Sequence, residues 1–207
     1  MGQPIKTDLN IPFSQEVSEW LAGKQTKTLG TMIDMFEQKS FAIVFLLMLS
    51  VPALPVTTGG ITHILLLPVS FIAAAQMLVG RRSLWMPQRF RKISLEGRIL
   101  KRALPFMVRR IKWFEKYSRP RLSGLLENNI IRSILGFIVL LCTAGAFFAV
   151  PFSGLDTLPA LGGVIIALAI ILEDFALSIL GIVVGMVGIG LIIGSGAAIT
   201  SLLQHAF

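Results

Sequence analysis

Long runs of apolar residues alternate with polar stretches along this chain. The first apolar block covers residues 41–79 and the second covers 134–203, in which only Asp156, Glu173 and Asp174 are charged. Prolines and glycines interrupt both blocks, and proline breaks a helix because it lacks a backbone donor. The pattern therefore predicts a series of apolar helices at residues 41–51, 61–79, 134–150, 158–172 and 175–203.

The lengths of these helices indicate how they relate to a membrane. A helix that crosses the hydrocarbon core needs about 20 residues at about 1.5 Å each, so the 11-residue piece 41–51 crosses about half of it. The piece 61–79 either spans or re-enters. We expect an all-α, polytopic helical membrane protein with two related halves, Pro-broken helices that include re-entrant ones, and amphipathic surface helices.

Composition favours the same class. The 207 residues are 54% hydrophobic and 14% charged, with a mean hydropathy of +0.78, whereas an ordinary soluble domain is about 25% charged. The single cysteine, Cys142, excludes an intrachain disulfide, and two histidines are too few for a histidine-rich metal site. We therefore expect no metal and no cofactor.

Two polar regions flank the first apolar block. Residues 1–40 form an N-terminal cytoplasmic segment with amphipathic helices, one capped by Ser14 and another placing Leu29, Ile33 and Phe36 on one face. Residues 81–121 hold 14 of the 19 Lys and Arg. Because Lys and Arg resist translocation, this loop is predicted to be cytoplasmic.

The basic loop also has apolar residues at alternating spacings of three and four, broken near Pro105 and ended by Pro120. This pattern predicts amphipathic helices that lie on anionic lipid headgroups. A cytoplasmic helical hairpin packed on itself is the alternative. The expected partners of this region are membrane lipids and a second copy of the chain, but not nucleic acid, because the positive charge is concentrated in one loop between apolar blocks.

The last apolar piece is rich in glycine. Small residues at a spacing of four let helix backbones approach closely in lipid. The glycines in question are Gly181, Gly185, Gly188, Gly190, Gly194 and Gly196. They predict a helix-packing face rather than a pore lining.

Weak self-similarity relates the two halves at an offset of 93 residues. Ser40 aligns with Ser133 where each apolar block starts, and Arg81 aligns with Asp174 where the matched region ends. Matching interrupted segments in two halves indicate a transporter-like site. The organisation is thus residues 1–40, a first membrane repeat at 41–80, the basic loop 81–121, and a second repeat with a final Gly-rich helix at 122–207. Whether the repeats are parallel or inverted stays open.

Several segments carry a resemblance to a known family. They are "TLGTMIDMF", "PALP" and "AAQMLVGRRSLWMP" in the first half, and "SRPRL" and "VPFSGLDTLPAL", followed by "ILED", in the second. Together they resemble the bacterial exopolysaccharide-synthesis ExoD family, from about Thr28 to Gly181. The resemblance implies a multi-pass inner-membrane protein tied to exopolysaccharide production, with the exopolysaccharide machinery as a partner. Asp156 stands where the family usually has Asn, and Phe175 where it usually has Gly.

The adjacent carboxylates Glu173 and Asp174 are the main candidate site. An ionised carboxylate at the bilayer centre costs about 2.5–3.5 kcal/mol, so the pair is either at a headgroup-level turn between two helices or neutralised. In the second case the repeat offers Arg81 and Arg82 as partners, since Arg pairs well with carboxylates. The seam between two helices is the slightly favoured alternative.

Two further polar residues belong to the candidate site. Gln76, in an apolar helix, either hydrogen-bonds across helices or touches substrate, and Asp156 is either a solvated loop charge or lines a cavity. No arrangement of nucleophile, base and acid stands out, so we expect no enzyme. The expected function is a role in exopolysaccharide synthesis through transport of an ion or small solute; the alternative is a non-transporting accessory protein.

Overall fold

The computed structural model describes residues 12–23, 26–36, 39–54, 62–92, 94, 104–117, 126, 128–149 and 153–206. Regular structure across this described part of the chain is helical, and its one β-type pairing is an isolated bridge between Thr28 and Ser94. The predicted all-α class is confirmed.

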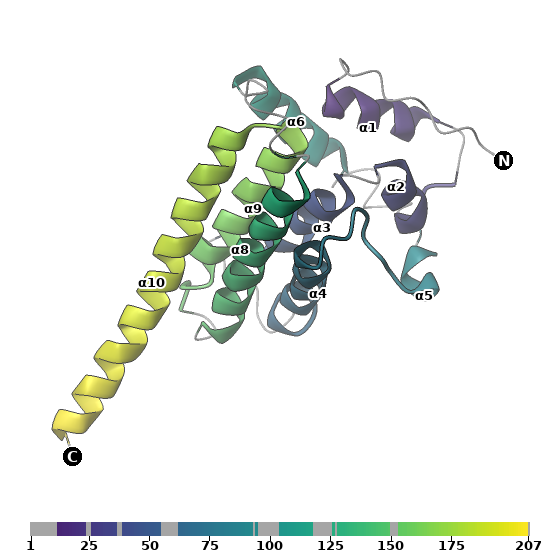
Figure 1. Ribbon diagram of the computed structural model, residues 1–207. Coiled ribbons are helices and arrows are strands. Elements are labelled where there is room, and N and C mark those ends of the chain that lie inside the picture. The colour runs from purple at the N-terminus through teal and green to yellow at the C-terminus, as the bar shows by residue number, and fades with distance from the viewer. Residues whose placement is uncertain are drawn as a thin grey trace.

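Five helices form a bundle (Figure 1). The connections α8–α9 and α9–α10 are short, so these consecutive helices run antiparallel. A π-helical turn, Thr62–Leu66, leads into the second helix. The five are α3 (Ser40–Leu49), α4 (Leu67–Leu78), α8 (Asn129–Phe148), α9 (Thr157–Leu172) and α10 (Phe175–Ala206). The far end of α10 extends beyond the bundle (Figure 1).

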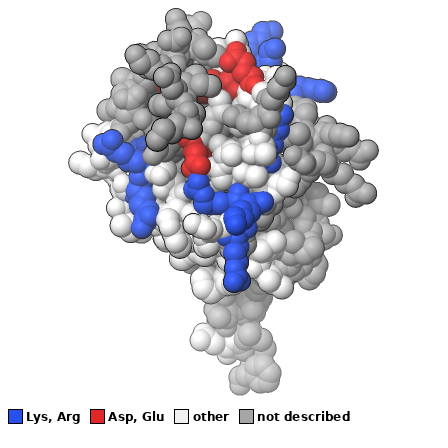
Figure 2. All heavy atoms as spheres, turned by 90° about the vertical axis from the view of Figure 1, so that its right-hand side faces the viewer, with Lys and Arg blue, Asp and Glu red and all other residues white. Residues whose placement is uncertain are grey.

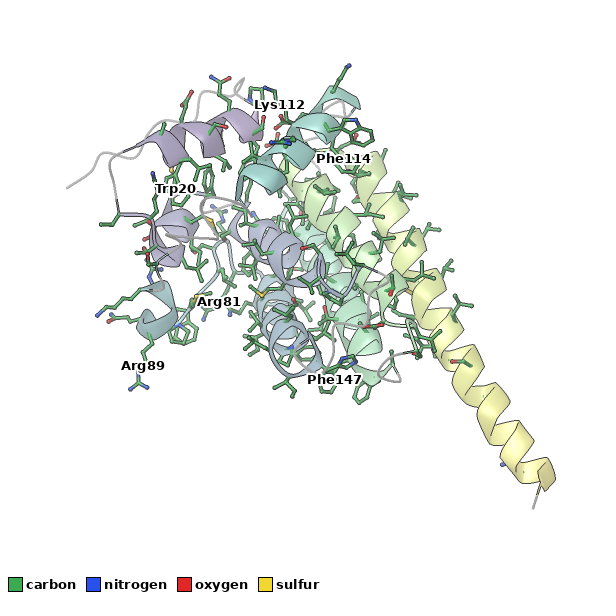
Figure 3. All side chains as sticks on the ribbon, turned by 180° about the vertical axis from the view of Figure 1, so that it is seen from behind. Trp20, Arg81, Arg89, Lys112, Phe114 and Phe147 are labelled. Atoms are coloured by element: carbon green, nitrogen blue, oxygen red, sulfur yellow. The ribbon has the colours of Figure 1, made fainter. Side chains whose placement is uncertain are left out.

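Shorter helices cover one end of this bundle: α1 (Phe13–Ala22), α2 (Leu29–Met35), α5 (Gln88–Arg91) and α6 (Leu104–Tyr117). Helix α1 packs on α6, and α2 packs on α5 and α3. The rings of Phe13 and Trp20 on α1 contact Phe36 edge-on at 5.1 and 6.5 Å between centroids. Apolar contacts therefore hold α1 and α2 together within this covering layer, with Trp20 lying between them (Figure 3).

Helix α3 has no polar face, and eight of its ten residues are buried. Phe41, Phe45 and Leu49 are fully buried. It packs against α4 and α9, while α4 packs most extensively on α8. The largest helix contact is between α9 and α10.

Close approach of α9 and α10 depends on glycine. A Cβ atom added to Gly162 would lie 2.5 Å from Gly185 Cα, and one added to Gly188 would lie 2.6 Å from Pro159 N. The packing role predicted for the glycines is confirmed for Gly181, Gly185 and Gly188. Among the described residues, a Cβ atom added to Gly190, Gly194 or Gly196 would have no neighbour within 4 Å, so the predicted packing role is not seen for these three.

Several predicted boundaries need correction. Helix α8 begins at Asn129, five residues before the predicted start, because Asn128 caps it by accepting from the Ile130 N–H at 2.9 Å. The basic region contains α5 and α6, and α6 ends at Tyr117. The amphipathic pattern predicted for the basic region at residues 93 and 95–103 lies outside the described residues, as do the predicted helix breaks at residues 55–60 and 151–152.

Ser14 does not cap α1. Pro12 occupies the N-cap position, and the Ser14 N–H instead donates to Glu115 Oε1 at 2.9 Å, while its hydroxyl donates to the other carboxylate oxygen. An acceptor from α6 thus satisfies the start of α1, where the helix dipole favours a negative charge. The buried face of α6 contains Ile111. This helix packs on α1.

Candidate functional site

The Glu173-Asp174 pair forms the turn between α9 and α10. Glu173 ends α9 in the left-handed conformation, with φ 55° and ψ 33°. Asp174 starts α10: its Oδ1 accepts from the Ala176 N–H at 3.1 Å, and its side chain is buried. The turn predicted between two helices is confirmed: Glu173 ends α9, and Asp174 caps the start of α10.

Glu173 is paired with Lys39, a residue that the sequence pattern did not single out. Lys39 Nζ lies 3.0 Å from Glu173 Oε1 and 5.4 Å from the centroid of the Phe13 ring. Lys39 immediately precedes α3, so this pair joins the start of α3 to the end of α9. We call Lys39 and Glu173 the α3–α9 joint.

The left-handed backbone at Glu173 has a cost. A residue with a Cβ atom in this conformation loses about 1–2 kcal/mol relative to the right-handed one, whereas glycine adopts it freely. The chain nevertheless places glutamate there, and its carboxylate reaches Lys39. An unfavourable backbone at a charged residue is typical of a position selected for its side chain.

Glu16 on α1 lies near this joint. Partial burial raises the pKa of the Glu16 carboxyl; the charge of Lys39 opposes this shift, and the carboxylate of Glu173 adds to it. Three helical regions thus place titratable groups within electrostatic reach of one another at the covered end of the bundle.

The Arg81-Arg82 segment lies at the same end but between α4 and α8. Both side chains are exposed. Gly80, with φ 82°, ends α4 and turns the chain. Arg132 on α8 donates from Nη2 to the backbone oxygen of Arg82 at 3.2 Å. We call Gly80, Arg82 and Arg132 the α4–α8 joint.

The structure brings the predicted arginines and carboxylates to one end without pairing them. Among the described residues, no ion pair joins Arg81 or Arg82 to Glu173 or Asp174. The reason is topological, because the arginines follow α4 and face α8, whereas Glu173 follows α9 and faces α3. The predicted partner of Glu173 is replaced by Lys39.

Gln76 has a local structural role. Its side-chain amide donates from Nε2 to the Trp85 oxygen at 3.1 Å, and its Oε1 accepts from the Trp85 N–H at 2.8 Å. These two bonds close the loop that carries Arg81 and Arg82. Of the two predicted alternatives, hydrogen bonding is the one observed, although it links Gln76 to a nearby loop.

Asp156 lies away from the other candidates. It precedes α9, at the end of the bundle opposite Glu173, and its backbone oxygen accepts from the Ala160 N–H at 3.1 Å. Phe147 marks the same far end (Figure 3). Asp156 therefore does not share a site with the arginines or with Glu173.

Charged side chains lie on the face of the molecule that carries α2 and α5. Figure 2, which shows this face, has Lys and Arg from the top of the molecule to the lower part of its main body, and none on the described atoms of the protruding end of α10. Within the described residues, no group of three or more His, Cys, Asp or Glu is placed to hold a metal ion. The charge contacts shown in this region are the ion pairs Lys39–Glu173 and Arg91–Asp34.

Comparison with known proteins places the chain in a family. No curated protein and no solved structure matches it. A family model described as "Exopolysaccharide synthesis, ExoD" matches residues 13–194, which is most of the chain. The protein therefore belongs to the ExoD family and, through it, is connected with exopolysaccharide synthesis.

Proposed function

We propose that the chain is a multi-pass protein of the bacterial inner membrane that supports exopolysaccharide synthesis as a non-enzymatic, non-transporting accessory protein. The observation that carries its membrane insertion is the apolar outer surface of the bundle. Helices α8 and α10 are long and apolar enough to cross a membrane. Large side chains on the bundle face outward, including Ile64 at 80% exposure, Ile130 at 69% and Phe148 at 79%. Such surface is unfavourable in water.

The orientation follows from charge. Lys39, Arg81, Arg82 and Arg132 lie at the covered end of the bundle, next to α5 and α6, and positive charge is retained on the cytoplasmic side. In this orientation α1, α2, α5 and α6 form a cytoplasmic layer. The exopolysaccharide machinery would meet the protein through this layer or through its lipid-facing helices.

We further infer that the two halves are repeats related by a two-fold axis along the bundle. At an offset of 93 residues, α1 aligns within α6, α3 within α8 and α4 within α9. The packing supports exchange symmetry, because α3 packs on α9, α4 packs on α8, and α1 packs on α6. The contact between α3 and α9 is thus equivalent to the contact between α8 and α4, as a two-fold exchange of the halves requires.

Matching backbone detail supports the same inference. Gly80 and Glu173 are 93 residues apart, and both have positive φ, 82° and 55°. Lys39 and Arg132 are also 93 residues apart, and each contacts the other half. Helices α3 and α8 start at the same end of the bundle, so these repeats are parallel; α10 has no counterpart in the first half.

The accessory role is favoured by the interior of the bundle. The buried hydroxyls of Ser70, Thr143 and Ser178 donate to backbone oxygens of their own helices at 3.0, 2.7 and 2.7 Å. Glycine contacts hold α9 against α10 at backbone distance. A transport path needs polar groups that face a water-filled cavity. These three hydroxyls instead donate to backbone oxygens three or four residues earlier in the chain.

Reconstitution tests this choice. Purified full-length protein in liposomes is expected to give proton and potassium fluxes equal to those of empty liposomes. In the same preparation, a cysteine replacing Lys112 and one replacing Ser153, each in a Cys142→Ser background, should react with impermeant reagents from opposite sides. Labelling of both from one side would contradict insertion across the membrane.

Transport of an ion or small solute is the second candidate. The specific observation in its favour is the cluster of Glu16, Lys39 and Glu173, where the pKa of Glu16 is raised. A proton flux that is lost in Glu173→Gln, and unchanged in the matched surface variant Glu19→Gln, would replace the accessory role with this one.

A further inference from the structure

The loop that follows α4 presents a tryptophan on a fixed backbone. Gln76 of α4 accepts from the Trp85 N–H at 2.8 Å and donates to the Trp85 oxygen at 3.1 Å. The preceding residue, Leu84, is buried, and its N–H donates to Ser40 Oγ at the start of α3 at 3.1 Å. The side chain of Trp85 is nevertheless 62% exposed. Helices α3 and α4 thus hold the backbone of this loop, while its largest side chain remains on the surface.

Two arginines precede this tryptophan in the same loop. Arg81 and Arg82 are both exposed. Among the described residues, neither of them forms an ion pair with an acidic side chain. Tryptophan is enriched where a membrane protein leaves the hydrocarbon core, because its ring is amphipathic, and guanidinium groups bind phosphate oxygens in pairs. The loop therefore combines two residue types that suit a layer of anionic headgroups.

The exposed apolar surface of the bundle ends beside this loop. On α4 and its C-terminal end, apolar side chains stay exposed up to Val79, at 80%, and charge begins two residues later at Arg81. On α8, Ile130 is 69% exposed and follows the exposed polar residues Asn128 and Asn129. These two helices pack on each other. Both change from apolar to polar at the same end, and this change locates the edge of the lipid-facing surface at the loop.

We infer that residues 81–85 form an interface anchor, which binds anionic phospholipid headgroups through Arg81 and Arg82 and places the Trp85 ring at headgroup level. Gln76 is a positioning residue for this anchor, because it acts through the backbone of Trp85. Lipid is favoured over an acidic protein as the occupant, since the cations directly adjoin exposed apolar side chains. The inference rests on the proposed membrane insertion, in which this end of the bundle meets the anionic cytoplasmic leaflet.

The experiment uses full-length, fluorotryptophan-labelled protein in nanodiscs with equal amounts of phosphatidylglycerol and phosphatidylcholine. Fluorine NMR separates the tryptophans, and Trp85→Phe identifies the Trp85 signal. A spin label near the top of an acyl chain, carried by one lipid or the other, broadens the signals of nearby tryptophans. The Trp85 signal should broaden strongly, and that of Trp20, which is 1% exposed in the covering layer, weakly. Labelled phosphatidylglycerol should broaden Trp85 about fivefold more than labelled phosphatidylcholine, the enrichment that corresponds to about 1 kcal/mol.

Charge variants test the arginines. Arg81→Gln with Arg82→Gln should make the two labelled lipids equally effective on the Trp85 signal. The matched control, Arg109→Gln with Lys112→Gln, removes two exposed charges from α6, where Lys112 lies well away from Arg81 (Figure 3). This control should keep the fivefold difference expected for wild type.

A variant of Gln76 tests the positioning. Gln76→Leu removes both hydrogen bonds to the Trp85 backbone, so the loop is no longer held against α4. The broadening of the Trp85 signal by both labelled lipids should fall. An unchanged Trp20 signal in the same sample shows that the covering layer keeps its fold, which separates positioning from a general loss of structure.

Several results would overturn the interface anchor. Equal broadening of Trp85 by the two labelled lipids in wild type, or an equal loss of the difference in the α6 double variant, would remove the headgroup site. Unchanged broadening in Gln76→Leu would remove the positioning role. If the wild-type protein does not incorporate into nanodiscs, the proposed insertion fails first. Normal incorporation with Trp85 broadened no more than Trp20 refutes the anchor alone, because the loop then faces water or another protein.

Discussion

The two joints at the covered end of the bundle use a similar backbone and different side chains. In the α3–α9 joint, Glu173 has positive φ and carries a carboxylate to Lys39; in the α4–α8 joint, Gly80 has positive φ, and Arg132 donates to the backbone oxygen of Arg82. Glycine adopts positive φ without strain, whereas glutamate supplies a carboxylate that pairs with Lys39. The difference shows that local backbone preference was satisfied in one joint and overridden in the other for an ionic contact.

The contact between α4 and α8 also differs from the contact between α3 and α9. A Cβ atom on Gly136 of α8 would lie 2.8 Å from Leu78 N and 3.0 Å from Met77 C, which are backbone atoms of α4. A Cβ atom on Gly163 of α9 would lie 2.5 Å from Leu49 Cδ1, the end of a side chain of α3. Backbone atoms move only with their helix, whereas a leucine tip rotates.

The largest expected effect is at Gly136. Gly136→Ala forces α8 away from α4 and should lower the free energy of unfolding by about 1–3 kcal/mol, the usual cost of overpacking. Reversible unfolding in mixed micelles, followed by circular dichroism, measures this change. Gly194→Ala, at a glycine with no neighbour within 4 Å, is the matched control and should not destabilise the protein.

Exchanging the turn residues should produce shifts of opposite sign. Gly80→Ala places a Cβ atom at φ 82° and should cost about 1–2 kcal/mol. Glu173→Gly relieves the same strain but loses the ion pair, so its net effect should be a gain of about 1 kcal/mol or less. The same unfolding assay applies, and a clear loss of stability in Glu173→Gly would show that the joint depends on its ion pair more than on its backbone.

Gly163→Ala should cost less than Gly136→Ala. Rotation of Leu49 absorbs the new methyl group, and alanine favours the helix by up to about 1 kcal/mol over glycine, so we expect a change within about 1 kcal/mol. The double variant Gly163→Ala with Leu49→Ala should show non-additivity, because the smaller side chain removes the clash. Strict additivity would mean that α9 shifts instead of Leu49.

The smallest expected effect is at Lys39. The Lys39–Glu173 pair is partly exposed, with 24% and 43% of the two side chains accessible, and pairs of this kind contribute about 0.2–1 kcal/mol. Lys39→Gln should therefore lower stability slightly, and less at high salt than at low salt. A loss that does not respond to salt would assign the contribution to packing of the lysine stem on Phe13.

The sequence was most informative where a pattern has one structural solution. Apolar stretches between proline breaks predicted α9 to within a residue and α10 to within three at its end, because long apolar runs form helices and proline interrupts them. The turn at Glu173-Asp174 followed from the same reasoning. Charge placement was less predictable: Lys39 was missed, although its position just before an apolar block and its counterpart Arg132 at the offset of 93 were available as signals.

The partner of each charge required the tertiary structure. Self-similarity at an offset of 93 aligned Arg81 with Asp174 and predicted a pairing between them, but Arg81 follows α4 whereas Asp174 follows α9, and the contact at Glu173 is with Lys39. The glycines of α10 show the same limit. Glycines recur along the whole of α10, yet among the described residues those in close contact with α8 or α9 are in its first half, for example Gly181, Gly185 and Gly188.

The sequence by itself determined the helical class, the order of the apolar helices, the concentration of positive charge in one region, and the family. These depend on local composition and periodicity, which act within a few turns of helix. Only the tertiary structure decided that α3 packs on α9 and α4 on α8, that Lys39 meets Glu173, and that Arg132 reaches the backbone oxygen of Arg82. Those contacts join residues far apart in the chain, and their geometry is set by how closely the helix backbones approach.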